Sequence, residues 1–357
     1  MHGGAPMLLF TTGIRLAGVV GAMLVALTPA LAEDAIAEFY RGKQVTISIG
    51  SSAGGGYDTY GLLLARYLGK YIPGNPAIVP QNMPGAGSKK AAGYVYSVAP
   101  KDGTAIGAIF PGAIMDPLLG IKEHLPYEAS KFVYLGSATT DVYLCVVRSD
   151  APVKTFAQAL KTEVILGASG EGASTKTFPA LLDNIVGAKF RLVSGYPGSH
   201  EILLALQKGE VQGLCGVSWS SLVAQHPDWL AKGFVRPLLQ EHATGHPDMN
   251  KMGVPLAVDF AKTDKDRQVL DLVYSQEIFG RPYVLPPGTP ADRAKVLRAA
   301  FMAALRDPEL LADAAKMHLD LHPVSGDDLQ KLVTKIYSMP ESVIERARSA
   351  SVYKPGH

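Results

Sequence analysis

The chain has 357 residues, 47% of them hydrophobic, which is enough apolar material for about two domains of roughly 100–200 residues each. The formal net charge is only +2, and basic and acidic residues are mixed along the chain without runs. Because a nucleic-acid-binding protein normally carries a basic stripe, we expect no nucleic-acid partner.

The N-terminus has the pattern of a secretory signal. Arg15 precedes an apolar run over residues 16–27, and Ala30-Leu31-Ala32 has the small-x-small form that a signal peptidase requires. We therefore predict that residues 1–32 are a signal peptide cleaved after Ala32 and that the mature protein is exported and soluble. A membrane anchor is the alternative, but the run is short for a span of about 20 residues. Met7 is a second candidate start, and the sequence leaves that choice open.

The mature chain opens with alternating strands and helices. Residues 45–49 are β-branched and predict a strand, Ser51–Asp58 is a glycine-rich loop, and residues 59–71 carry leucines at helical spacing. The next expected elements are a strand at 78–79, a helix at 88–98 and a strand at 104–109. The order strand–helix–strand–helix–strand predicts a parallel sheet flanked by helices.

The same order begins again after two strands between Tyr134 and Val147. Residues 164–166 predict a strand, Gly167–Thr175 is a second glycine-rich loop, and a helix follows at 176–186. The remaining expected elements are strands at 190–193, 211–217 and 235–239, helices at 200–208 and 292–305, and a helical tail at 325–351. This recurrence predicts two similar α/β lobes with a ligand site between them.

The two glycine-rich loops are suited to binding an anion. Each precedes a predicted helix, whose first backbone N–H groups are unpaired and carry a partial positive charge. Serine and threonine hydroxyls add donors, so two such loops facing one cleft hold an anionic ligand without Arg or Lys. The alternative is that each loop is only a tight turn, but the equivalent places of the two loops favour the anion site. Glu171 counts against a simple dicarboxylate unless it points outward.

Motifs of other functional classes do not fit this chain. Gly54–Asp58 and the segment from Gly85 lack the full dinucleotide-binding pattern, and Thr175 stands where a P-loop requires glycine. Gly216–Ser220 approaches the nucleophile elbow but ends in serine. An exported serine hydrolase using Ser218 or Ser169 remains the alternative function, although His200 and His226 have no recognisable acid partner. We expect no enzyme, no cofactor and no metal site.

Cys145 and Cys215 lie in apolar segments that resemble strands. Export permits a disulfide between them. Two buried free thiols are the alternative that the apolar surroundings favour somewhat.

Over about residues 39–329 the chain resembles the substrate-binding proteins of tripartite tricarboxylate transporters, the TctC or Bug family. The matching segments occur in the family's order: FYRGKQVTISIGSSAGGGYD, QNMPGAGSKKAA, APKDGTAIG, GASGEGAST, GYPGSHEILLALQKGEVQGL and LPPGTPADRAKVLRAAFMAALRDPEL. Each segment is loosely specific alone, but their order and spacing together are specific.

The resemblance implies a periplasmic-binding-protein-like (type II) Venus flytrap with two parallel or mixed-sheet α/β lobes joined by crossing strands near 143–147 and 279–284. Lobe 1 would comprise residues 33–142 and 280–357, and lobe 2 residues 143–279. It also implies a monomeric periplasmic receptor that captures a small carboxylate for the transmembrane permease subunits of a tripartite transporter. A sensory receptor of the same fold is a further alternative.

The resemblance also implies where the ligand binds, largely through backbone N–H groups of the two loops. Asp58 is expected to fix the first loop as a cap. The expected ligand-binding residues are Ser51, Ser52, Ala53, Gly54, Gly55, Gly56, Tyr57, Asp58, Phe110, Pro111, Gly112, Ser169, Gly170, Glu171, Gly172, Ala173, Ser174, Thr175, Tyr196, Pro197, Gly198 and Ser218. Departures from the family, such as Gly216 at an acidic position, leave an aliphatic di- or tricarboxylate and an aromatic acid both open.

Overall fold

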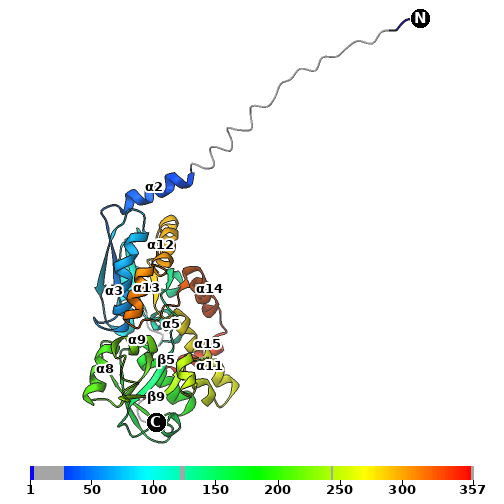
Figure 1. Cartoon of the computed structure of the whole chain (residues 1–357). Coiled ribbons are helices and arrows are strands. Elements are labelled where there is room, and N and C mark those ends of the chain that lie inside the picture. Colours follow the sequence, from blue (N-terminus) through cyan, green and yellow to red (C-terminus); the bar gives the residue numbers. More distant parts are fainter. Residues whose placement is uncertain (4–27, 121–124, 243, 355–357) are drawn as a thin grey trace.

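The computed structural model describes residues 1–3, 28–120, 125–242 and 244–354 (Figure 1). The apolar run of the predicted signal peptide, residues 16–27, lies outside the described residues. The predicted cleavage site falls within the first described helix, α2 (Thr28–Tyr40). Within the described ranges, no helix has both the length and the apolar character needed to cross a bilayer.

A six-stranded sheet forms the first lobe, in the order β11–β4–β10–β3–β1–β2. Its strands are β1 (Gln44–Ile49), β2 (Ala77–Asn82), β3 (Ala105–Ala108), β4 (Val133–Ser137), β10 (Pro282–Leu285) and β11 (Val324–Ser325). β1 pairs in parallel with β2 and β3, as the sequence predicted, whereas β10 runs antiparallel to β3 and β4. The sheet is therefore mixed.

Helices cover both faces of this sheet. The helices are α3 (Gly56–Leu68), α4 (Lys89–Ser97), α5 (Pro111–Leu119), α12 (Ala291–Ala304), α13 (Pro308–Lys316) and α14 (Gly326–Tyr337), with the short 3-10 turns η1 (Gly69–Tyr71), η2 (Ala86–Ser88) and η3 (Ala129–Lys131). Alternation along β1 sends Ile47 and Ile49 into a core with Leu64 of α3 and Phe301 of α12. α4 and α14 cover the other face, where Val95 and Val333 are buried.

A five-stranded sheet forms the second lobe, in the order β7–β6–β8–β5–β9. Its strands are β5 (Tyr143–Arg148), β6 (Val164–Ala168), β7 (Phe190–Ser194), β8 (Gly213–Ser218) and β9 (Val235–Glu241). β6 is parallel to β7 and β8, and β5 is antiparallel to β8 and β9. The second sheet thus repeats the mixed pattern of the first.

The helical elements of this lobe are α6 (Phe156–Ala159), α7 (Ser174–Leu181), the π-helical turn η4 (Leu182–Val186), α8 (Ser199–Lys208), α9 (Trp219–Gln225), α10 (Pro247–Lys251), η5 (Ala257–Phe260), α11 (Asp264–Tyr274) and η6 (Ser275–Phe279). Strand alternation divides β5 between two cores: Leu144 and Val146 pack with α8, and Cys145 and Val147 pack with α7 and α11. Figure 1 shows α3, α12, α13 and α14 in the upper part of the molecule and α8, α9 and α11 in the lower part.

The chain passes between the sheets twice. The first passage, residues 138–142, leads from β4 to β5, and the second runs through η6 into β10. The two passages touch, because the amide of Asp141 donates to the carbonyl of Glu277 at 3.2 Å. Residues 143–147, which we expected to cross, belong to β5 inside the second sheet, because both edges of that strand are paired.

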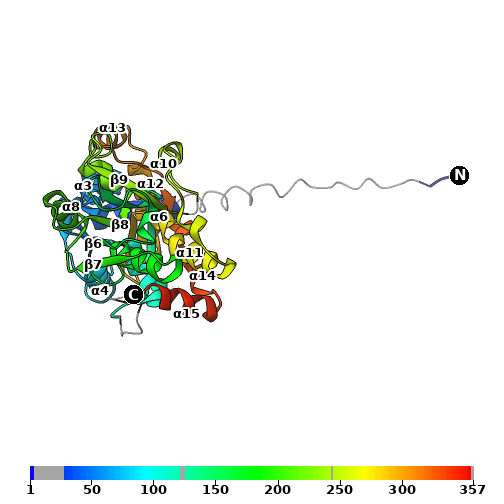
Figure 2. The same ribbon diagram turned by 90° about the horizontal axis from the view of Figure 1, so that it is seen from below.

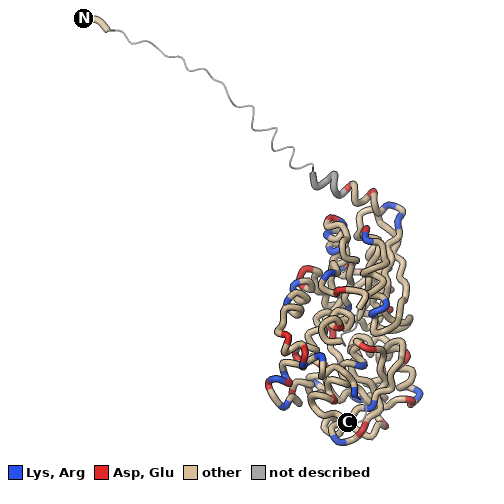
Figure 3. Tube along the Cα trace, turned by 180° about the vertical axis from the view of Figure 1, so that it is seen from behind, with Lys and Arg blue, Asp and Glu red and all other residues tan. Residues whose placement is uncertain are grey.

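The C-terminal helix α15 (Glu341–Ala350) contacts both α5 and α11 and lies beside α11 and α14 in Figure 2. Beyond it, the amide of Asn184 donates to the carbonyls of Ala350 and Val352, each at 2.9 Å. The tail therefore touches elements of both lobes, and the assignment of residues 280–357 to lobe 1 stays a prediction. Charges of both signs are interspersed along the described trace (Figure 3).

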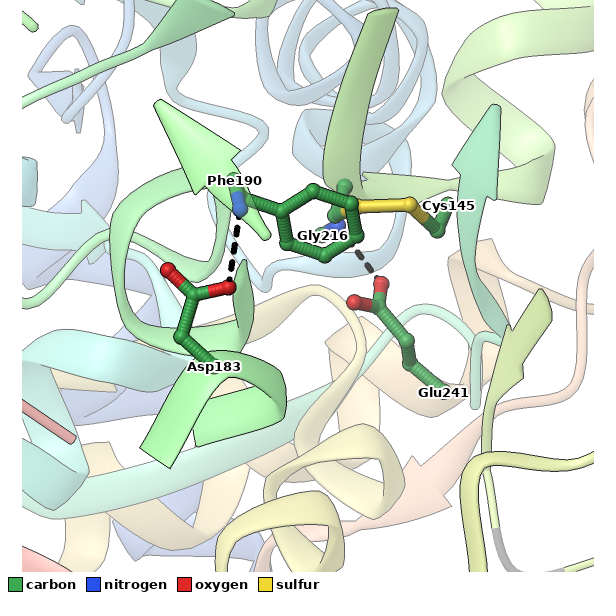
Figure 4. Close-up of a disulfide and its surroundings, with 6 residues drawn as sticks. Cys145, Asp183, Phe190, Gly216 and Glu241 are labelled. Atoms are coloured by element: carbon green, nitrogen blue, oxygen red, sulfur yellow. Dashed lines mark hydrogen bonds between the residues drawn. A yellow bond between two sulfur atoms is a disulfide. The ribbon is translucent and has the colours of Figure 1, made fainter. Parts of the chain in front are cut away.

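Cys145 and Cys215 form a disulfide, so the expectation of free thiols is wrong. The bond joins the neighbouring antiparallel strands β5 and β8, and both residues are fully buried (Figure 4). The sequence left open whether this disulfide forms, because its formation depends on the register of two strands whose cysteines are separated by 70 positions in the chain.

Candidate functional site

A cavity of about 550 Å³, part of it open to solvent, lies where the loops of the two sheets meet. From the first lobe it is lined by Ser51, Ser52, Gly55, Gly56, Tyr57, Phe110, Pro111 and Gly112. From the second lobe and its return passage it is lined by Tyr143, Ser169, Ala173, Ser174, Thr175, Ser199, Gly216, Val217, Ser218, Ser221 and Gln276. None of these lining residues carries a charged side chain.

Five helices begin at this cavity: α3, α5, α7, α8 and α9. The first backbone N–H groups of a helix have no partner within the helix, and the helix dipole places partial positive charge there. The cavity is therefore electropositive without a cation in its lining. The sequence predicted this arrangement for α3 and α7, and the structure adds the other three helices.

The first glycine-rich loop is held by the buried carboxylate of Asp58. One oxygen accepts from the amide of Gly54 at 2.9 Å, and the other accepts from the side-chain amide of Asn82 at 2.8 Å. Asn82 also donates to the carbonyl of Ser51 at 3.1 Å. Asp58 thus fixes the conformation of the loop without lining the cavity, in agreement with the expected role as a cap.

The second glycine-rich loop is held by hydroxyl groups. Thr175 accepts from the amide of Ser169 at 3.1 Å, and Ser174 donates to the carbonyl of Gly216 at 2.7 Å. The amide of Gly216 in turn donates to the buried carboxyl of Glu241 at 2.6 Å (Figure 4). Glu171 pairs with Lys176, has a largely exposed side chain and is absent from the lining, so it does not oppose an anion in the cavity.

The structure gathers most of the predicted residues and separates others. Those that line the cavity are Ser51, Ser52, Gly55, Gly56, Tyr57, Phe110, Pro111, Gly112, Ser169, Ala173, Ser174, Thr175 and Ser218. Those outside its lining are Ala53, Gly54, Asp58, Gly170, Glu171, Gly172, Tyr196, Pro197 and Gly198. Glu171 and Gly172 line a neighbouring cavity with Lys89 and Asp116, whose side chains are paired at 3.0 Å.

Sequence reasoning missed Tyr143, Ser199, Gly216, Val217, Ser221 and Gln276. Ser199 could have been predicted from the sequence, because it ends the predicted turn at 195–199 and is the first residue of the helix that follows. Tyr143 reaches the cavity because β5 begins at the passage between the sheets, where its hydroxyl lies 3.4 Å from that of Tyr57. The aromatic wall is completed by Phe110, whose ring centroid is 4.4 Å from that of Tyr57.

The two lobes meet at the cavity through small residues. A side chain added at Gly56 would lie 1.9 Å from the hydroxyl of Ser221, and one added at Gly112 would lie 1.7 Å from the carbonyl of Gly172. The hydroxyl of Ser52 donates across the gap to Glu201 of α8 at 3.0 Å. Glycine at positions 56 and 112 therefore permits this close approach of the lobes.

A buried ion pair lies behind the cavity. Arg281 at the start of β10 is 1% exposed, and its guanidinium is 3.1 Å from Asp141. The guanidinium carbon stacks 4.2 Å from the ring centroid of Tyr57 and 5.0 Å from that of Tyr60. Burial acts to lower the pKa of Arg281, but Asp141 and the neighbouring tyrosine hydroxyls together outweigh burial and raise that pKa above its usual value.

Two buried carboxyls, those of Glu241 and Glu277, lie near each other. Burial raises the pKa of Glu241 to about 8, against a smaller lowering effect of the Gly216 amide. Burial also raises the pKa of Glu277 well above its usual range, and the nearby Glu241 adds to the rise. The hydroxyl of Tyr274 and one oxygen of each carboxyl have no hydrogen-bond partner in the described part of the chain. At neutral pH the Glu241 carboxyl is therefore predominantly protonated.

The environment of Ser218 does not resemble that of a catalytic serine. Its hydroxyl donates to Asp141 at 2.6 Å and caps α9 by accepting from the amide of Ser221 at 3.0 Å. His200 contacts Gln225 and His226 stacks on Trp229, so neither histidine reaches Ser218. Within the described ranges, no group of three or more His, Cys, Asp or Glu side chains is arranged to hold a metal ion.

No family model matches the chain. A curated relative, the UPF0065 protein in the TAR-I ttuE-ttuC' intergenic region of Agrobacterium vitis, is 31% identical over 186 residues. That match covers 49% of this chain and 51% of the relative, so the chain spans about half the length of this curated protein.

Solved structures share the fold over most of the chain. The periplasmic binding protein BugD superposes with a TM-score of 0.68 at 19% identity, covering 88% of this chain and 100% of BugD. MatC from Rhodopseudomonas palustris with bound malate has a TM-score of 0.66 at 20% identity, with 87% and 99% covered. R. palustris Rpa4515 with adipate has a TM-score of 0.66 at 21% identity, with 85% and 97% covered.

A TctC solute-binding protein from Polaromonas has the same fold with a TM-score of 0.56 at 19% identity, with 86% of this chain and 99% of that protein covered. The predicted two-lobed α/β architecture is thus confirmed. The chain shares this fold with solved structures described as a TctC solute-binding protein and as the periplasmic binding protein BugD, the fold that the sequence resemblance implied.

Proposed function

We propose that this protein is a receptor that captures a small carboxylate in the cavity between its lobes. The observation that carries the proposal is the convergence of five helix N-termini on a cavity with no charged side chain in its lining. Unpaired backbone N–H groups at such positions bind anions. Lining hydroxyls whose hydrogens are not donated to another group in the described part of the chain, such as those of Ser169, Thr175 and Ser199, supply further donors.

The cavity also limits the kind of carboxylate. Its hydrogen-bond donors are concentrated at the helix starts. Tyr57, Phe110 and Tyr143 give it an aromatic wall. A ligand with an anionic end and a short hydrocarbon part fits both features. The bound malate of MatC and the adipate of Rpa4515, two proteins of this fold, are of that class.

The protein's compartment and partner follow from the same proposal. The secretory pattern of residues 1–32, with cleavage after Ala32, and the periplasmic relatives support a location in the periplasm. A disulfide between Cys145 and Cys215 agrees with an oxidising compartment. The receptor would release its carboxylate to the membrane permease subunits of a tripartite tricarboxylate-type transporter and would itself catalyse no reaction.

A thermal-shift screen tests the proposed function. The mature chain is melted with a panel of aliphatic di- and tricarboxylates and aromatic acids, each paired with its uncharged amide. A ligand that binds only the folded state raises the melting temperature by mass action. We expect at least one carboxylate to raise it while its amide does not. Stabilisation by amides and carboxylates alike would contradict the proposal, as would the absence of any shift across the panel.

A further inference from the structure

The buried guanidinium of Arg281 is separated from the cavity by serine hydroxyls that it contacts. Arg281 is absent from the cavity lining, but its Nη2 contacts the hydroxyl oxygens of Ser218 and Ser221, each at 2.6 Å. Both serines line the cavity. Longer contacts from the same nitrogen reach Ser220 at 3.0 Å and Asp141 at 3.1 Å. Nη2 has only two hydrogens for these four oxygens. The two shortest contacts, to Ser218 and Ser221, are therefore taken as its hydrogen bonds.

Ser218 has no remaining hydrogen-bonding capacity in this cluster. Its single hydrogen goes to Asp141 at 2.6 Å. Its two lone pairs accept from Arg281 at 2.6 Å and from the backbone amide of Ser221 at 3.0 Å. A serine hydroxyl has one donor and two acceptor positions, and all three are filled. Although Ser218 lines the cavity, its hydroxyl is therefore committed to the protein.

Ser221 is in the opposite situation. Its hydroxyl accepts from Arg281, so its oxygen faces a permanent positive charge. The nearest other hydroxyl, that of Ser218, is 3.1 Å away and has no free lone pair to accept a second hydrogen bond. The hydrogen of Ser221 is therefore available to an acceptor in the cavity that this residue lines. A donor whose oxygen accepts from a cation is polarised and makes a stronger bond to an anion.

We propose that Arg281 sets the preference of the cavity for anions through the hydroxyl of Ser221, which donates to a carboxylate oxygen of the ligand. The inference rests on the proposed function and identifies the side chain that discriminates charge at that site. Arg281 is a positioning residue, because it orients and polarises Ser221 and does not touch the ligand. The Asp141 carboxylate neutralises the guanidinium behind the serines, so the ligand does not meet a full positive charge.

Ser220 supplies a matched control. Its hydroxyl also contacts Arg281 and donates to Asp141 at 2.6 Å, and it is as deeply buried as Ser221. It does not line the cavity. Ser220→Ala and Ser221→Ala therefore remove the same atom from neighbouring places around one guanidinium, but only the second change removes a donor from the cavity.

The test measures binding of malate and of adipate, each beside its diamide, by calorimetry to wild type, Ser221→Ala and Ser220→Ala. We expect Ser221→Ala to weaken carboxylate binding about 10- to 100-fold, the range for a hydrogen bond to a charged group. Amide binding should change much less, and Ser220→Ala should bind carboxylates as the wild type does. Arg281→Lys keeps the charge but loses the fixed planar geometry of the guanidinium donors, so it should retain part of the preference for carboxylates over amides.

Each outcome is decisive. Equal carboxylate affinity in wild type and Ser221→Ala overturns the inference and leaves the proposed function standing. Equal losses in Ser220→Ala and Ser221→Ala, or equal losses for carboxylates and amides, also overturn it, because they indicate damage to the fold and not a lost donor. Wild type that binds neither carboxylate overturns the inference, and failure across the whole thermal-shift panel overturns the proposed function. If Arg281→Lys does not fold, the two serine variants decide alone.

Discussion

The two glycine-rich loops perform the same task with different supports. In the first lobe, the carboxylate of Asp58 stands in the first turn of α3 and binds the loop directly. In the second lobe, the first turn of α7 contains no acidic residue, and the loop is held by Thr175 and Ser174. The only acid inside that loop, Glu171, is turned away to Lys176.

This difference indicates where a ligand carboxylate should bind most tightly. An acid in the first turn partly compensates the positive end of a helix. α3 and α8 carry such acids, Asp58 and Glu201, whereas α5 and α7 have none. The uncompensated helix starts should therefore hold the ligand's charge, and the first loop should mainly supply shape and additional donors.

The largest effect is expected from the deeper support of the second loop. The carboxyl of Glu241 accepts from the amide of Gly216, whose carbonyl accepts from the hydroxyl of Ser174. Burial raises the pKa of Glu241 in the folded chain to about 8, against a usual value of 4.5. Between these two pH values the folded chain keeps a proton that the unfolded chain has lost. The free energy of unfolding therefore falls as the pH rises from about 4.5 to about 8, by up to roughly 5 kcal/mol. Urea unfolding of wild type and Glu241→Gln at pH 5 and pH 8 measures this.

Glu241→Gln keeps an acceptor for the Gly216 amide but cannot ionise. The variant should lose much less stability than wild type between the two pH values. The same loss in both proteins would show that Glu241 does not carry this pH dependence.

Placing a carboxylate at either helix start should abolish binding. Gly55 and Ala173 are the N-cap residues of α3 and α7, and neither has a side-chain cap. The conformation at Gly55, with φ −76°, accepts an L residue, and the nearest atom to an added Cβ is 3.5 Å away. Asp at either position should cap the helix and occupy the anion site, which weakens carboxylate binding by at least about 100-fold.

Asn at the same positions is the neutral control for this substitution. It should reduce affinity less, because it brings no charge into the cavity. Ala173→Asp should cost more affinity than Gly55→Asp if the second loop holds the charge. Calorimetry that gives the reverse order would overturn the comparison of the loops, and unchanged affinity in Gly55→Asp would remove the first loop from the site.

Removing the support of the first loop should cost stability more than affinity. Asp58→Ala leaves the Gly54 amide and the Asn82 side chain without their shared acceptor, at a cost of about 2–3 kcal/mol. Asp58→Asn keeps one acceptor oxygen and should cost about half as much. Urea midpoints that do not move in Asp58→Ala would show that the carboxylate does not fix this loop.

The smallest effect is expected at Thr175. Thr175→Val keeps the shape of the side chain but removes the acceptor of the Ser169 amide, at a cost of about 1 kcal/mol. Thermal unfolding measures this loss. A cost equal to that of Asp58→Ala would mean that the hydroxyl supports the second loop as strongly as the carboxylate supports the first.

The sequence predicted residues that line the cavity where the signal was local. Glycine and serine before a periodic apolar segment identified the loops that end at α3 and α7, and the order of elements predicted two α/β lobes. Tyr143 and Gln276 were missed because they reach the cavity only through the path of the chain between the sheets, and Ser221 was missed because α9 was not among the predicted helices. Arg281 gave no local signal, since its contact with Ser218 joins residues 63 positions apart.

The most direct test of the central claim is the ionisation of the bound ligand. NMR titration of a carboxyl-labelled ligand, malate or adipate as the thermal-shift screen selects, reports whether the acid is charged in the complex. Neutral donors at helix N-termini stabilise the ionised form. The carboxyl at the α7 start should therefore remain ionised well below the pKa of the free acid. A bound acid that is protonated near neutral pH, or that titrates as it does in water, would contradict the account.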